Sequence, residues 1–435
     1  MRFVSLYNEY ALYRFLTNRY LLNGNVVLLY YYMDDNLVLN EIHVANYKSL
    51  VDTDIKLHAE LTALIGLNGS GKTSTLGAVK LLRQLASGNA RHRRYGVEEN
   101  IYPMTEIIAS FTYKNDTYRL KAELYLDNIE VYDEVKYFEL YLKRVSKMTK
   151  WTKIDPEAFD FIDYLIRANR LHTHERMYLP DDEILRDFLF KLTPFLRSIK
   201  YYGATVFSDP SKSPISFELE EDRSARRPNK RSGHQQFLYD LYILKYNNKK
   251  AYQRYINAVN HLGVNLVDDI DFSQIKVPNS SVKIKAGGMT EKITSNRVLV
   301  VPIFSIGTLQ LSPNQLSEGT FKTLALIFYI LNDNSKLMLI EEPEVCVHHG
   351  LLSNVMELIK DQSKYKQIVV STHSDYVLDK ISPENVSLVR KSNQGTIVEP
   401  LQSAMSKDDY RALKLYLNDS GNLGEYWKED GFSFK

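Results

Sequence analysis

Four short motifs constrain the fold of this 435-residue chain more than any other feature. The first, residues 66–73, has the form Gly-x-x-x-x-Gly-Lys-Thr, and the other three, residues 316–320, 337–344 and 369–373, lie near the C-terminal end. The first pattern requires a buried strand before it and a helix after it. The chain is therefore predicted to be an α/β protein in which segments far apart in the sequence meet at one site.

The residues around the first motif have the periodicity that this arrangement needs. Residues 61–65 are apolar and run directly into the glycines, and residues 73–85 carry apolar side chains near helical spacing. The glycines let backbone N–H groups turn inward around phosphates, and the helix points the positive end of its dipole at them. Lys72 is predicted to neutralise the β- and γ-phosphates, and Thr73 to bind Mg²⁺ through its hydroxyl. The residues expected to contact the nucleotide are Gly66, Asn68, Gly69, Ser70, Gly71, Lys72, Thr73 and Ser74.

The third motif ends an apolar strand, residues 337–340, in two carboxylates. Acids in this position lie at the carboxyl edge of a parallel sheet, beside the glycine-rich loop. Glu341 is predicted to hold the Mg²⁺ shell through water, and Glu342 to be the general base that polarises the attacking water. These residues imply ATP and Mg²⁺ as cofactors. The alternative is a solvated acidic turn before Pro343.

Two further motifs complete the set. His373 follows a Val-rich strand, residues 367–371, where its imidazole can donate to the γ-phosphate and act in catalysis with Lys72 and Glu342. Ser317 is predicted to cap a helix over residues 321–331, and Gly319 to allow close approach of the backbone to a phosphate. A polar turn before a helix is common, so this last motif alone is equally compatible with a simple helix start.

The rest of the chain is predicted to form a β lobe and a helical region. Residues 37–45 favour a strand, and residues 107–113 and 118–126 alternate around a turn and predict a hairpin. No apolar heptad is sustained, so long coiled-coil arms are not expected. The middle segments predicted to be helical are residues 159–170, 183–196 and 235–262. The predicted domains are an N-terminal extension (1–36), an N-lobe with the glycine-rich loop and β lobe (37–150), a mostly helical insertion (151–297) and a C-lobe (298–435).

Composition excludes several classes of protein. A formal net charge of +2 leaves any nucleic-acid contact to local basic segments. The single cysteine, Cys346, excludes an internal disulfide framework and a multi-cysteine zinc site. No apolar run approaches the ~18 residues of a membrane-spanning helix. The chain is therefore expected to be cytoplasmic, without a membrane anchor.

Together these motifs resemble the ABC-type ATPase head shared by chromosome-maintenance, recombination and overcoming-lysogenization-defect (SMC/RecF/OLD-like) proteins, from about residue 37 onward. The resemblance implies an ATP-hydrolysing P-loop NTPase of ABC type with an antiparallel β lobe and a mostly helical insertion. It implies that Lys48, before the glycine-rich loop, lies near the nucleotide. It also implies that Ser317 and Gly319 contact the γ-phosphate bound to a second chain, in a head-to-tail homodimer or higher homo-oligomer around the ATP sites. Glu318 stands where that family usually has a small residue.

A narrower resemblance concerns two segments. Residues 341–348, with His348, are similar to the acid-rich segment of OLD-like ATPases, although His349 stands where proline is usual. Residues 424–427, Gly-Glu-Tyr-Trp, are similar to the tail of ATPases from anti-phage defence operons such as the Septu and retron systems. This implies a sensor or regulatory subunit that controls a nuclease-like effector encoded nearby. No glutamine loop for Mg²⁺ is recognised, and too few residues follow His373 for the Toprim nuclease of OLD proteins.

Other features leave alternatives open. Residues 91–94 and 223–231 are basic, and either contact DNA or RNA or form solvated loops. His172 and His174 have metal-like spacing but no complementary cluster, which favours a helix surface, and residues 268–271 favour turn and cap roles over a metal site. The competing functions are a DNA repair or recombination clamp that binds DNA directly, a self-contained ATP-dependent nuclease and a transporter motor.

Overall fold

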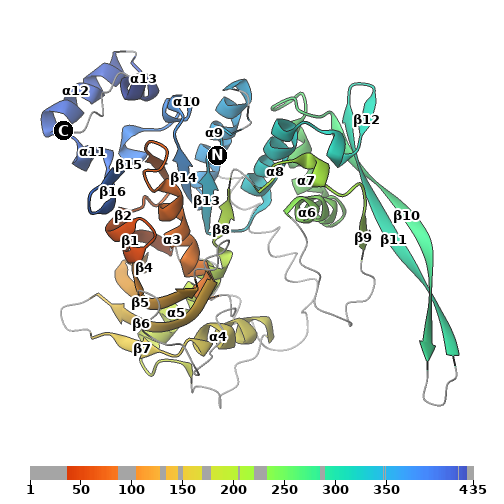
Figure 1. Ribbon diagram of the computed structural model, residues 1–435, viewed down its shortest axis with the longest axis horizontal. Helices are drawn as coiled ribbons and strands as arrows, with labels where there is room; N and C mark the ends of the chain where they lie inside the picture. The colour runs from red at the N-terminus through yellow and green to blue at the C-terminus, as the bar shows by residue number, and fades with distance from the viewer. Residues whose placement is uncertain are drawn as a thin grey trace.

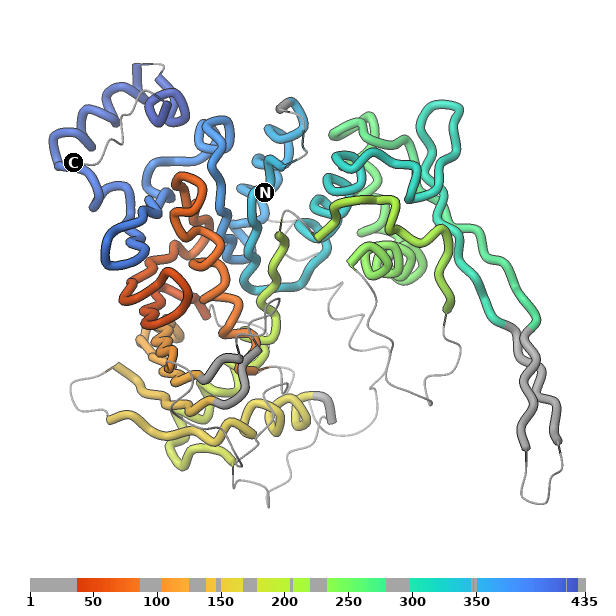
Figure 2. The backbone as a smooth tube through the Cα atoms, viewed as in Figure 1, coloured from red at the N-terminus to blue at the C-terminus, as the bar shows by residue number. Residues whose placement is uncertain are grey.

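A mainly parallel, six-stranded sheet lies at the centre of the computed structural model (Figure 1). The structure describes residues 37–86, 104–127, 134–145, 150–168, 178–203, 206–219, 233–284, 290–345, 347, 349–419 and 421–428. The sheet joins parts of the chain that are far apart in sequence. In Figure 2, segments coloured red (N-terminal) and blue (C-terminal) lie side by side in it. Its strands, in spatial order, are β16 (Gly395–Pro400), β15 (Val386–Ser392), β3 (Leu61–Ile65), β14 (Gln367–Thr372), β13 (Leu337–Glu341) and β8 (Lys200–Tyr202).

The two faces of the central sheet are buried against two different cores. Leu337 and Leu339 face the core that contains α3 (Lys72–Leu85) and the antiparallel lobe. Met338 and Ile340 face the core that contains α8 (Glu318–Asn332) and α9 (His349–Ser363). Side chains alternate along a strand, so a strand covered on both sides is apolar throughout. This explains why β3, β13 and β14 are mostly apolar in sequence.

The predicted hairpin is confirmed as part of a six-stranded sheet that forms the antiparallel lobe. Lys114 and Asn115 have positive φ angles of 49° and 65°, the geometry of a tight hairpin turn, and Tyr113 pairs with Asp116. The strands, in spatial order, are β2 (Leu50–Lys56), β1 (Val38–Tyr47), β4 (Thr105–Tyr113), β5 (Asp116–Asp127), β6 (Glu134–Arg144) and β7 (Thr152–Ile154).

Two helices accompany this lobe. The helix α5 (Glu183–Ser198) contacts β6 and shares the core of the antiparallel sheet, where its Phe188 stacks on Tyr118 with ring centroids 4.1 Å apart. The helix α4 (Glu157–Ala168) packs against α5. These helices confirm the predictions for residues 159–168 and 183–196, whereas residues 169 and 170 lie outside the described residues.

The helix predicted over residues 235–262 is instead two helices, α6 (Gly233–Asn247) and α7 (Lys249–Val259). Asn248 separates them because its side chain accepts a hydrogen bond from Ala251 N–H at 3.1 Å and caps α7. A residue with a capping side chain favours a helix start over a helix interior. The single long helix was therefore a wrong prediction.

The region between residues 151 and 297 also contains strands that were not predicted. The strand β8 joins the central sheet beside β13. The strands β10 (Asp269–Ile284) and β11 (Thr290–Ile306) project from the molecule as a long ribbon, with β9 (Phe217–Leu219) and β12 (Leu309–Leu311) near its base (Figure 1). The longest helix in the described part of the chain, α5, has 16 residues, too few for a coiled-coil arm.

Four short helices lie in the C-terminal part of the chain, the first between β14 and β15 and the other three after β16. They are α10 (Asp375–Leu378), α11 (Leu401–Ala404), α12 (Lys407–Asn418) and α13 (Leu423–Lys428). Within the described ranges, no helix is long and apolar enough to cross a bilayer. The predicted α/β fold with an antiparallel β lobe is confirmed.

Gln367 joins the central sheet to the antiparallel lobe and offers a test of this arrangement. Its buried side chain bonds both backbone groups of Leu39 and the carbonyl of His58. Gln367→Leu is expected to lower the free energy of unfolding by about 2–4 kcal/mol, because these buried groups lose their partner. Urea denaturation followed by circular dichroism measures the change. The exposed Gln402→Leu is the control, and equal stability of the two variants would contradict the prediction.

Candidate functional site

The central sheet brings three of the predicted motifs to one edge. The strands β3, β14 and β13 are adjacent and parallel, with Ile65 paired with Thr372 and Ser371 paired with Glu341. The glycine-rich loop, His373 and the two glutamates therefore follow neighbouring strand ends. This is the edge at which open α/β sheets bind their ligands.

The glycine-rich loop has the backbone geometry of an anion site. Gly69 and Gly71 have φ angles of 78° and 110°, which favour glycine, and α3 starts at Lys72 with no side-chain cap. A Cβ atom on Gly71 would lie 2.3 Å from Thr396 Oγ1. In addition, Ser70 Oγ is buried and has no hydrogen-bond partner among the described residues. The loop thus ends in uncapped N–H groups at the start of α3, which suit a phosphate.

Lys72 is buried at the centre of this edge. Its Nζ donates to the carbonyls of Gly66 and Leu67, at 2.8 and 3.2 Å, and forms no ion pair with a described carboxylate. Burial lowers the pKa of the Lys72 ammonium, and three carboxylates oppose this shift: Glu342, Glu344 and Glu341. A buried cation without an ion-pair partner fits an anionic ligand such as a triphosphate.

Thr73 and Glu341 meet as the predicted Mg²⁺ site requires. Thr73 Oγ1 donates to Glu341 Oε1 at 2.5 Å, and the other carboxylate oxygen accepts from the Tyr201 hydroxyl. Burial, and then the hydrogen bond to Glu341, raise the pKa of Tyr201 well above its ordinary value. A hydroxyl and a carboxylate are the oxygen ligands that Mg²⁺ prefers beside phosphates. The residues present therefore fit a Mg²⁺-bound nucleotide.

Glu342 and His373 lie together next to this pair. His373 Nδ1 is 3.4 Å from Glu342 Oε1, and Glu342 N–H donates to the Ser371 carbonyl at 2.8 Å. Glu342 has a φ of 46°, a strained conformation for a residue with a side chain. Such strain is concentrated at functional sites, where the surrounding structure maintains it.

Thr396 and Ser49 support the loop, and sequence reasoning missed both. Thr396 Oγ1 lies 3.0 Å from the Ser70 carbonyl and 2.9 Å from Ser49 Oγ, and Thr396 N–H donates to the Ser49 carbonyl. No local pattern marks a threonine so far from the loop in sequence. The adjacent Lys48 is exposed in the turn between β1 and β2, with a φ of 52° and its Nζ 5.3 Å from the centre of the Tyr47 ring.

Ser317 and Gly319 lie at the start of α8. Ser317 Oγ accepts from Thr320 N–H at 3.1 Å, which confirms the predicted N-cap, and the Gly319 carbonyl accepts from Thr323. The helix α8 packs against α7 and α9, and strands of the central sheet lie between it and α3 in Figure 1. Ser317 and Gly319 are thus on a different part of the chain's surface from the glycine-rich loop.

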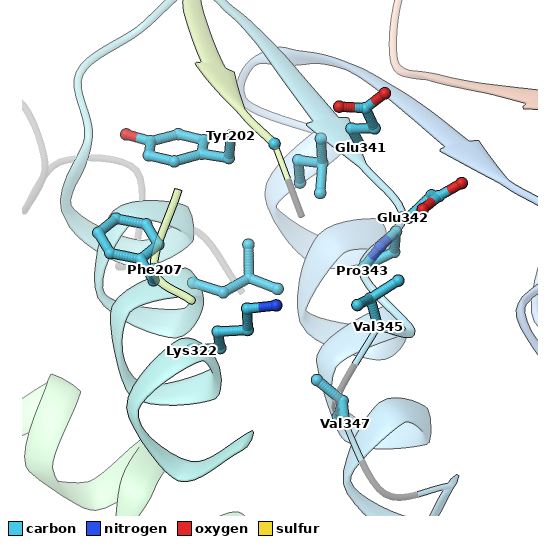
Figure 3. Close-up of a pocket in the computed structure, with 11 residues that line it drawn as sticks. Tyr202, Phe207, Lys322, Glu341, Glu342, Pro343, Val345 and Val347 are labelled. Carbon is cyan, nitrogen blue, oxygen red and sulfur yellow. The ribbon is translucent and has the colours of Figure 1, made fainter. Parts of the chain in front are cut away.

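A small cavity of about 40 Å³ lies behind the two glutamates, between α8 and the segment after β13. Figure 3 shows the Lys322 side chain pointing into this cavity, whereas the carboxylates of Glu341 and Glu342 point away from it. Lys322 Nζ also pairs with Glu318, 3.2 Å away. The cavity therefore belongs to the junction between α8 and β13, while the acids face the edge that carries the loop.

Several predicted features do not join this site. The carboxylate of Asp268 accepts from Gly307 N–H, as a turn residue does. Asp271 instead lies in the strand β10 and pairs with Lys245, so the predicted turn or cap role is wrong for this residue. Within the described ranges, no cluster of three histidine, cysteine or acidic side chains could hold a metal ion. The remaining features lie outside the described residues: the N-terminal extension, the basic segments 91–94 and 223–231, His172, His174, Cys346 and His348.

Thr396 offers a test of the loop's support. Thr396→Val keeps the side-chain volume but removes the hydroxyl that bonds Ser70 and Ser49. The loop should lose its preorganised shape, so the Kd for ATP is expected to rise about tenfold, a loss that corresponds to one buried hydrogen bond. Titration with a fluorescent ATP analogue measures it. Thr396→Ser keeps the hydroxyl and should bind like the wild type, and equal weakening in both variants would refute this role.

The family model that matches most of the chain agrees with this geometry. Residues 38–378 match the family model described as AAA ATPase domain. The chain has no match among curated proteins. Among solved structures it is similar to the SMC head domain from Thermotoga maritima, with 14% identity, a TM-score of 0.41 and coverage of 83% of this chain and 98% of that one. It is also similar to an SMC head with an extended coiled coil bound to the C-terminal domain of ScpA from Pyrococcus furiosus, with 13% identity, a TM-score of 0.45 and coverage of 88% and 100%. The chain belongs to the AAA ATPase domain family, and it is a P-loop ATPase.

Proposed function

We propose that this ATPase hydrolyses ATP with Mg²⁺ at the edge shared by β3, β14 and β13. The observation that carries the proposal is the contact of Thr73 with Glu341 beside the buried Lys72. A hydroxyl, a carboxylate and an ammonium so arranged are what a Mg²⁺-bound triphosphate needs. Mg²⁺, when bound, neutralises charge on the phosphate oxygens.

Each residue of the site has a separate task in this proposal. Lys72 neutralises the β- and γ-phosphates, while Thr73 and Glu341 hold the metal, Glu341 through water. Glu342 accepts the proton of the attacking water as general base. His373 donates to the γ-phosphate and so distinguishes the ATP state from the ADP state. Catalysis then depends mainly on positioning and charge.

ATP binding is proposed to join two chains head to tail. Ser317 caps α8 and Gly319 lies in its first turn, where the positive end of the helix dipole attracts an anion. Because α8 and α3 are separated by the central sheet in Figure 1, we expect these residues to reach the γ-phosphate of a second chain. Two ATP molecules then lie in the interface between the chains, and ATP hydrolysis lets the two chains separate.

The ATP cycle is further proposed to control a partner effector, of nuclease type, in anti-phage defence. The tail that resembles that of defence ATPases, residues 424–427, is in contact with α10 (Asp375–Leu378) close to the site. Gly424 N–H donates to Asp379 at 2.7 Å, and a Cβ atom on Gly424 would lie 2.2 Å from the Asp375 carbonyl. The helix α13 therefore packs tightly on α10, which begins two residues after His373. A partner that binds the tail is therefore expected to change the position of His373 through α10.

Lys72→Ala tests nucleotide binding. Removing the buried ammonium should weaken ATP binding at least about 100-fold, because a charge-assisted interaction with the phosphates is lost. Isothermal titration calorimetry measures the affinity. Lys360→Ala changes an exposed lysine of α9 and should bind normally. Undiminished ATP binding by Lys72→Ala would show that the nucleotide lies elsewhere.

Glu342→Gln tests the general base and the dimer together. The variant keeps the size of the side chain but cannot accept the proton, so kcat is expected to fall about 100-fold or more. Light scattering with ATP and Mg²⁺ should then show a persistent dimer. The exposed Glu357→Gln serves as the control. Full turnover by Glu342→Gln would exclude Glu342 as the base, and a trapped monomer would exclude the ATP-linked dimer.

A further inference from the structure

We propose that Glu344 is a positioning residue that holds His373 at the reacting end of the nucleotide, an inference that rests on the proposed ATP hydrolysis. Glu344 lies two residues after Glu342 and has no role in the mechanism described above. Its side chain is only 10% exposed. A carboxylate so deeply buried requires hydrogen-bond donors, and the identity of those donors indicates its role.

Within the described residues, the two hydrogen bonds that Glu344 accepts both go to Oε1 and come from the strand end that carries His373, while Oε2 is buried without a partner. Glu344 Oε1 accepts from the Thr372 hydroxyl at 2.6 Å and from His373 N–H at 3.1 Å. The bonded backbone amide is therefore that of the histidine itself. Glu344 thus fixes the position of the His373 backbone relative to the segment after β13.

Glu344 also limits the position of the imidazole ring. His373 Nδ1 lies 3.4 Å from Glu344 Oε1 and 3.4 Å from Glu342 Oε1, so the ring nitrogen sits between two carboxylates. The His373 side chain is 43% exposed. Of these two carboxylates, Glu342 is the one assigned to proton transfer, which leaves Glu344 to fix the orientation of the ring.

The same contacts continue into the following helix. Thr372 Oγ1, which donates to Glu344, also accepts from Ser374 N–H at 2.9 Å. Ser374 in turn caps α10 through Val377 N–H. A continuous chain of hydrogen bonds therefore runs from Glu344 past His373 to α10. Loss of the Glu344 carboxylate should leave His373 free to move at its backbone as well as at its ring.

The test compares two substitutions at one position. Glu344→Ala removes the acceptor, so kcat for ATP hydrolysis is expected to fall about 10- to 100-fold while the KM for ATP stays within about threefold. Glu344→Gln keeps an oxygen acceptor of the same reach and should restore kcat to within about fivefold of the wild type. A KM that rises with an unchanged kcat would overturn the positioning role.

A double-mutant cycle with His373→Ala shows whether Glu344 acts through the histidine. If it does, Glu344→Ala should lower kcat by less than about threefold in the His373→Ala background, because residues that act as a unit are not additive. A purely structural role predicts multiplied effects, and that result would overturn the inference. If His373→Ala hydrolyses ATP like the wild type, the proposed role of His373 fails instead, and the two failures are thereby distinguished.

Thr372→Val keeps the test decisive if Glu344→Ala does not fold. The substitution keeps the volume of this buried side chain but removes the hydroxyl that bonds Glu344 and Ser374. The variant should fold, as judged by its Tm, and should show the same selective loss of kcat. A folded Thr372→Val protein with a wild-type kcat would overturn the inference.

Discussion

The parallel pairing of β3, β14 and β13 is the constraint on which the whole site depends. Parallel neighbours end at the same edge, so a loop after residue 65, a histidine at 373 and glutamates at 341 and 342 become neighbours although most of the chain separates them. The strands hold this register because both faces of the sheet are buried. A shift by one residue would exchange the two apolar faces of each strand.

Support for the site comes from elements that carry no nucleotide-binding motif. Thr396, at the antiparallel edge strand β16, holds the glycine-rich loop from behind, and Tyr201 of β8 holds Glu341 from the opposite end of the sheet. Gln367 binds the sheet to the antiparallel lobe. The catalytic geometry is therefore a property of the whole sheet, and the edge strands stabilise the residues that face the ligand.

The sequence predicted the parts of the structure that depend on local chemistry. The glycine-rich loop, the buried strands and the Ser317 cap each need particular residues at fixed spacing, and the structure places all of them as predicted. Asn248 was a capping signal that the long predicted helix ignored, and Gly287-Gly288 between β-favouring runs was a hairpin signal for β10 and β11. Thr396 and the three-residue strand β8 could not be predicted, because their places depend on tertiary pairing alone.

A crystal structure with a non-hydrolysable ATP analogue and Mn²⁺ in place of Mg²⁺ tests the central claim most directly, because anomalous scattering locates the metal. The account predicts Mn²⁺ bound by Thr73 Oγ1, close to Glu341, with the terminal phosphates next to Lys72 Nζ. A nucleotide and metal bound at any other edge or face of the sheet would contradict it.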